Sequence, residues 1–112
     1  LGKIIHPQVR KRLKNFFRAN TKKKFVILDI PLFLENRLNT KKDIVIFIDA
    51  DKNKISKKIN KRKNVNLKLI KILKKNQFPN RIKKEKSNFV IKNNFISKTA
   101  KKNVKLILNR IN

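Results

Sequence analysis

Four residue types are missing from this 112-residue chain. It contains no cysteine, methionine, tryptophan or tyrosine, and Gly2 is its one glycine. The lack of cysteine excludes disulfides, thiolate metal sites and thiol nucleophiles. A Walker A loop and a dinucleotide-binding fingerprint each need several glycines, so neither lies within these residues. Any glycine-rich loop that cradles a phosphate must therefore come from other sequence.

Histidine and long apolar runs are also scarce. His6 is the single histidine, which argues against a zinc centre and against a serine–histidine triad. The longest apolar runs, at residues 25–28 and 44–48, are far shorter than the roughly 20 residues that a membrane-spanning helix needs. We therefore expect a soluble, cytoplasmic protein with no membrane partner. Because the chain starts at Leu1 and has no methionine, we interpret it as a fragment of a longer product.

Positive charge is present in large excess. The chain has 33 lysines and arginines against six acidic residues, a net charge of +27, which often indicates a nucleic-acid or anionic partner. However, lysine, asparagine and isoleucine all have A/T-rich codons, so a mutational bias explains the same composition. The lysines are also spread along the whole chain. We therefore expect a solvated surface and no nucleic-acid partner, and keep a small basic nucleic-acid-binding protein as the main alternative.

The first half of the chain alternates helix and strand patterns. Apolar residues with helical spacing predict a helix over residues 7–19. The runs at 25–30 and 44–48 are apolar without alternation, which is typical of parallel strands covered on both faces. Pro31 should end the first strand because proline has no amide hydrogen to donate. Residues 32–38 should then form a short helical or looped connection.

The second half is more strongly charged. Two helices are predicted between positions 51 and 76, and their narrow apolar stripes indicate that residues 52–86 form a mobile lid. A short helix should start at Pro79, followed by a strand over 88–91 and a last helix from Ser97. The alternation of strands and helices predicts an α/β fold.

Four of the six acidic residues flank the two strongest predicted strands. Asp29, Asp49 and Asp51 would lie at the carboxyl ends of strands, where ligands bind in open α/β sheets, and Asp43 precedes the second strand. Acids at such ends often orient magnesium or its water in phosphoryl-transfer enzymes. The alternative is a turn that ends the strand. Asp29, which lies in an otherwise apolar run, is the strongest functional candidate.

Arginine is rare in this lysine-rich chain, and three arginines are candidates for phosphate binding. Arg10, Arg62 and Arg81 carry the planar fork that grips a phosphate, which lysine does not reproduce. Sequence drift explains an isolated arginine equally well. His6, beside Pro7, is by itself typical of a helix start whose ring bonds a local carbonyl.

Taken in order, these segments resemble the dephospho-coenzyme A kinase family of P-loop kinases. His6, Pro7 and Arg10 are similar to the family's His-Pro-x-x-Arg helix start. Residues 29–36 resemble its motif Asp-(Ile/Val)-Pro-Leu-Leu-Phe-Glu, the most specific of the matches. Residues 43–50 look like the family strand that follows.

The resemblance continues without a gap through the predicted lid. Arg62 aligns with a lid arginine, and Gln77 and Lys83 align with a glutamine and a lysine that follow it. Residues 87–93 resemble the segment before the last helix. The chain departs from the family pattern at four positions: Lys58 in place of a first lid arginine, Asn88 in place of aspartate, and Phe33 and Leu34 in swapped order.

The resemblance implies a fold and an activity. Residues 1–112 would be the C-terminal portion of a single kinase domain, with helices on both sides of a parallel sheet in three layers and 52–86 as its lid. The central P-loop strand would be missing from between the two strongest predicted strands. The implied reaction is transfer of the ATP γ-phosphoryl group, with magnesium, to the ribose 3′-hydroxyl of dephospho-coenzyme A. This is the last step of coenzyme A synthesis.

The resemblance also implies roles for individual residues. Asp29 and Arg62 would be catalytic, and Asp29 would also hold the metal. The remaining implied binding residues are His6, Arg10, Pro31 and Glu35 for the acceptor, and Arg62 and Asn93 for ATP. We expect the fragment alone to be inactive, and a different P-loop nucleotide kinase is a further alternative.

Overall fold

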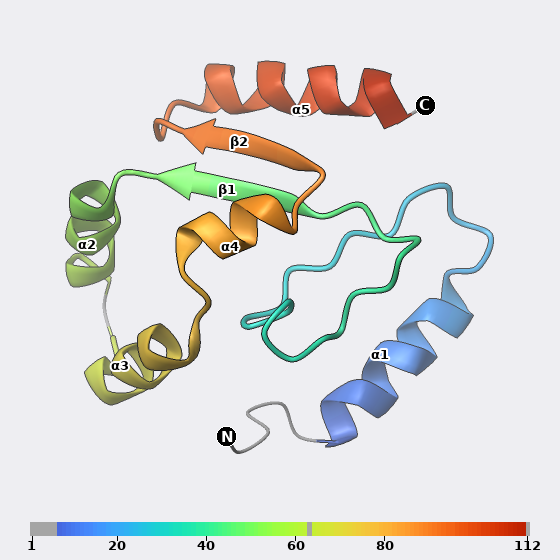
Figure 1. The fold of residues 1–112 in the computed structure, drawn as a ribbon, viewed down its shortest axis with the longest axis horizontal. Helices are drawn as coiled ribbons and strands as arrows, with labels where there is room; N and C mark the ends of the chain where they lie inside the picture. The colour runs from blue at the N-terminus through green and yellow to red at the C-terminus, as the bar shows by residue number, and fades with distance from the viewer. Residues whose placement is uncertain (1–6, 63, 112) are drawn as a thin grey trace. The chain divides into compact units, whose positions relative to one another are not determined.

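The computed structural model describes residues 7–62 and 64–111 (Figure 1). The contacts divide the chain into two compact units, the first ending at Asn39 and the second starting at Thr40. Each unit is described by itself.

The first unit contains one helix and a series of turns. Helix α1 spans Pro7–Ala19, as predicted. A turn follows, in which the Lys23 N–H donates to the Asn20 carbonyl at 3.1 Å. Beyond residue 30 the chain forms consecutive turns over residues 31–37. Leu32, only 5% exposed, is the buried residue of this unit in the described part of the chain.

The prediction of a strand over residues 25–30 is wrong. These residues form no regular secondary structure and belong to no sheet, and Ile27 is 87% exposed. A strand needs a neighbour to receive its backbone hydrogen bonds. Within residues 7–62 and 64–111, the sheet consists of two other strands. Residues 25–30 therefore have the apolar sequence of a strand but no neighbouring strand to pair with.

The second unit is an α/β arrangement around a small parallel sheet. Strand β1, Ile46–Ala50, pairs in parallel with β2, Phe89–Asn93, from Ile46 opposite Phe89 to Ala50 opposite Asn93. Both strands start and end slightly later than predicted. The connection between them contains α2 (Lys52–Asn60), α3 (Leu67–Asn76) and α4 (Asn80–Glu85). The α/β prediction is confirmed at this level.

Helix α5, Ser97–Ile111, lies along β2 (Figure 1). Ile107 on α5 and Ile91 on β2 are each 9% exposed and are the buried residues of the second unit in the described part of the chain. On the other strand, the Lys83 ammonium of α4 lies 5.6 Å from the centre of the Phe47 ring of β1. None of the described helices is both long enough and apolar enough to cross a membrane.

Candidate functional site

Two sequence motifs of the first unit meet through one hydrogen bond. The Arg10 Nη2 atom, on α1, donates to the backbone carbonyl of Asn36 at 3.2 Å. Arg10 lies on the first half of α1, and Asn36 lies near the end of the turns at 31–37. The structure therefore joins the helix start to the Asp-Ile-Pro-Leu segment, 26 residues further along the chain.

Asn36 also closes the turn in which it lies. Its side-chain Nδ2 and its backbone N–H both donate to the Leu32 carbonyl, each at 3.0 Å. Asn36 is not among the site residues predicted from the sequence. Asparagine side chains often hydrogen-bond nearby backbone groups, and this tendency is the sequence signal for a residue that closes a turn.

The predicted residues of this unit differ in exposure. Asp29 and Pro31 are exposed, whereas Arg10 and Glu35 are half-buried. Pro31 and Glu35 lie in the turn that Arg10 contacts, and Asp29 comes two residues before Pro31. His6 lies outside the described residues.

Asp29 fits magnesium as its single protein ligand. Within residues 7–62 and 64–111 there is no group of three or more carboxylates or histidines that could hold a metal. Magnesium, however, is commonly held by one or two carboxylates together with substrate phosphates and water. An exposed carboxylate such as Asp29 fits that coordination as a single protein ligand.

The acids of the second unit serve its local structure. Asp51 caps α2, since its Oδ1 accepts from the Asn53 N–H at 2.8 Å and the Lys54 N–H at 3.1 Å. Asp49 forms an ion pair with Lys84 at 3.0 Å. Asp43 Oδ2 accepts from the Thr40 N–H at 2.8 Å. Each of these three aspartates therefore has a structural partner.

Arg62 and Asn93 both belong to the second unit. Arg62 is exposed just after α2, and its backbone N–H donates to the Ile59 carbonyl at 3.1 Å. Asn93 ends β2, and its Oδ1 accepts from the Phe95 N–H at 2.9 Å. In the described part of the chain no hydrogen bond joins Arg62 to Asn93. The side-chain oxygen of Asn93 thus already accepts a hydrogen bond within the turn before α5.

Lys58, which the family resemblance predicts to stand in place of a lid arginine, approaches that turn. Its ammonium lies 5.0 Å from the centre of the Phe95 ring, within the range of a cation–π contact. Phe95 has a left-handed backbone, with φ of 62°. The contact brings α2 to the segment between β2 and α5.

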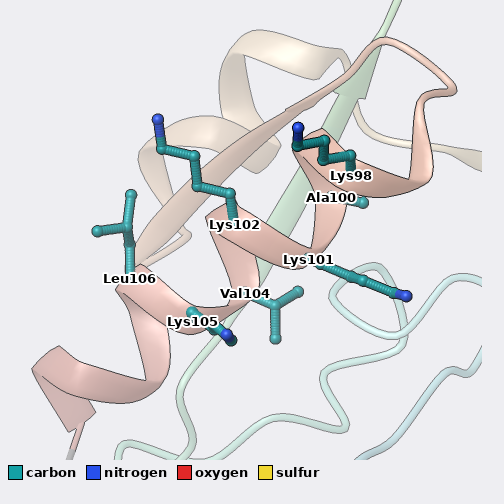
Figure 2. Close-up of a pocket in the computed structure, with 7 residues that line it drawn as sticks. All are labelled: Lys98, Ala100, Lys101, Lys102, Val104, Lys105 and Leu106. Atoms are coloured by element: carbon teal, nitrogen blue, oxygen red, sulfur yellow. The ribbon is translucent and has the colours of Figure 1, made fainter.

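A surface hollow along α5 contains none of the predicted site residues. Figure 2 shows its lining residues, which all come from this helix. They are Lys98, Ala100, Lys101, Lys102, Val104, Lys105 and Leu106. The hollow combines apolar side chains with lysines and offers no carboxylate for acid–base chemistry.

The family model and the curated relatives that match this chain all name the same protein family. The family model described as dephospho-CoA kinase matches residues 1–99. The dephospho-CoA kinase of Bartonella quintana (strain Toulouse) is 31% identical over 93 residues, which cover 81% of this chain and 48% of that protein. The dephospho-CoA kinase of Wolbachia pipientis wMel is 28% identical over 112 residues, 97% of this chain and 56% of that protein.

A third relative, the dephospho-CoA kinase of Zymomonas mobilis, is 31% identical over 93 residues, 83% of this chain and 47% of that protein. The chain thus spans about half the length of the curated relatives that it matches. No solved structure gives a significant match. Since the family model covers most of the sequence, and since the segments that meet at Arg10 and Asn36 lie within its range, the chain belongs to the dephospho-CoA kinase family.

Proposed function

We propose that these residues form the acceptor-binding part and the lid of an enzyme that phosphorylates the ribose 3′-hydroxyl of dephospho-CoA with ATP. Membership of the dephospho-CoA kinase family supports the reaction. The observation that carries the acceptor role is the hydrogen bond from Arg10 to the Asn36 carbonyl. It links a half-buried guanidinium to the turn that follows Asp29.

Each proposed role follows from the chemistry of phosphoryl transfer, in which positioning and charge neutralisation supply most of the catalysis. His6, Arg10, Pro31 and Glu35 would bind the acceptor. Asp29 would orient the acceptor region and act as a protein ligand of magnesium, which neutralises phosphate charge when bound. These roles place the acceptor chemistry on the first unit.

The ATP side would come from the second unit. Arg62, exposed after α2, would move with a lid over residues 52–86 and neutralise charge on the transferred phosphate. Asn93 would lie on the nucleotide side at the carboxyl end of β2. In this proposal, residues 1–112 belong to a single P-loop kinase domain with helices on both sides of its sheet. The P-loop comes from sequence outside these residues.

The test is phosphoryl transfer by the complete protein that contains these residues. With ATP and magnesium, it should convert dephospho-CoA to CoA. Arg62→Lys should lower kcat by about tenfold or more, because lysine does not reproduce the bidentate grip of arginine on phosphate. Arg18→Lys, in the last turn of α1, is the matched control and should leave kcat unchanged.

The proposed role of Asp29 is tested by a magnesium titration. Asp29→Asn removes the charge and should raise the magnesium concentration needed for half-maximal rate. Asp43→Asn, at an acid whose carboxylate accepts from the Thr40 N–H, is the control and should leave this concentration unchanged. A complete protein with no activity on dephospho-CoA would overturn the proposed function.

Nucleic-acid binding is a second candidate function, favoured by the charge pattern of α5. Lys98, Lys101, Lys102 and Lys105 follow helical spacing and lie along the hollow of Figure 2. In the described part of the chain, one lysine–carboxylate ion pair, Lys84 with Asp49, offsets the positive charge. This candidate predicts RNA or DNA affinity that falls steeply with added salt. Kinase activity together with weak, sequence-independent binding would exclude it as the main function.

A further inference from the structure

Asn36 takes part in three hydrogen bonds that shape the turns at residues 31–37, here called the acceptor turn. Its backbone N–H and its side-chain Nδ2 both donate to the Leu32 carbonyl, and its own carbonyl accepts from Arg10 Nη2. The next two residues continue the pattern. Arg37 N–H donates to the Leu34 carbonyl at 3.0 Å, and Leu38 N–H to the Phe33 carbonyl at 3.1 Å.

The residue that receives two of these bonds has an unfavourable backbone conformation. Leu32 has a φ of 56°, in the left-handed region where the Cβ of an L-residue is crowded. It is also 5% exposed, so its side chain is fixed by burial. The paired bonds from Asn36 to the Leu32 carbonyl therefore hold a conformation that the chain would otherwise leave.

The bond from Arg10 restricts the guanidinium as well. A guanidinium has five N–H donors, and one of them is used by the Asn36 carbonyl. The remaining donors are held in a fixed fork, which is the geometry that binds a phosphate or a carboxylate. Asn36 thus fixes both the turn and the orientation of the arginine beside it.

We infer that Asn36 is a positioning residue for the acceptor substrate, acting through Leu32 and Arg10. The inference rests on the proposed function, since it concerns the same acceptor site. In this role Asn36 would act through these two residues and not by contact with the reacting atoms. Its effect is to hold residues 31–37 and the Arg10 side chain in the arrangement that binds the acceptor.

The test is steady-state kinetics of the complete protein with Asn36→Ala. Loss of the side-chain bond to the Leu32 carbonyl should raise KM for dephospho-CoA by about tenfold, since the turn then samples other conformations. KM for ATP and kcat should each stay within about twofold, because the ATP side is untouched. Asn36→Asp, which keeps the size but loses the N–H donor, should behave like Asn36→Ala.

Asn39→Ala is the matched control, because Asn39 is an exposed asparagine just beyond the same turn. It should leave both KM values unchanged. Amide hydrogen exchange gives an independent readout: exchange at residues 36–38 should become faster in Asn36→Ala and not in Asn39→Ala.

The outcomes separate the inference from the proposed function. If Asn36→Ala is active with an unchanged KM for dephospho-CoA, or if it only lowers kcat while both KM values hold, the positioning role is overturned and the kinase function stands. If the unmodified protein does not phosphorylate dephospho-CoA, the proposed function fails, and the acceptor role of Asn36 fails with it.

Discussion

Asn88 and Val45 bond each other twice and so start the pairing of the two strands. The Asn88 N–H donates to the Val45 carbonyl, and the Val45 N–H donates to the Asn88 Oδ1, both at 2.8 Å. The side chain of Asn88 thus takes the place of a backbone acceptor just before β2. The aspartate that the family resemblance predicts at this position would offer an equivalent oxygen.

Replacing Asn88 tests that structural role. Asn88→Ala should lower the free energy of unfolding by about 1 kcal/mol, the typical net value of one hydrogen bond. Asn88→Asp keeps the accepting oxygen and should be close to the original protein. The measurement is urea unfolding of the complete protein followed by circular dichroism. Equal losses in both variants would contradict the role of Oδ1.

Asp51 should behave as a helix cap and not as a catalytic acid. Asp51→Ala removes the acceptor for the Asn53 and Lys54 N–H groups and should cost about 1 kcal/mol of stability. Asp51→Asn keeps a capping oxygen and should retain both stability and kcat. Unfolding midpoints and steady-state rates provide the check. A large loss of kcat in Asp51→Asn would instead indicate a role in phosphate or metal chemistry.

The packing of α5 on β2 depends on Ile107. Ile107→Ala should destabilise the complete protein by about 2 kcal/mol or more, since it removes buried methylene groups and leaves a cavity. Leu106→Ala changes the neighbouring residue, which is 56% exposed, and is expected to cost well under half as much. Thermal unfolding of the two variants side by side gives the comparison. Equal shifts would show that α5 is not packed through Ile107.

The 112 residues alone should not unfold cooperatively. In the described part of the chain, three residues are buried, Leu32, Ile91 and Ile107, whereas Ile46 and Ile48 on β1 are exposed. Such a core buries too little apolar surface to offset the conformational entropy of folding. Denaturant titration of these residues should give a broad, shallow transition, and the complete protein should give a steeper one. A single steep transition of the short chain would refute this prediction.

Much of the helical structure could be predicted from local sequence. The apolar spacing in residues 7–19 sets α1, and the last helix has a similar stripe. The acids beside the strands were harder to interpret. Asp29 remains exposed, while Asp49 and Asp51 have local partners that sequence spacing alone could not separate from a functional role.

Residue types and their spacing were enough to predict the α/β character of the chain, the order of its motifs and its resemblance to one kinase family. The folded structure was needed to show that residues 25–30 lack a strand partner, that Asn88 starts the β1–β2 pairing, and that Asn36 connects Arg10 to Leu32. Strand pairing and long-range hydrogen bonds depend on which backbone groups meet in space. Local patterns do not contain that information.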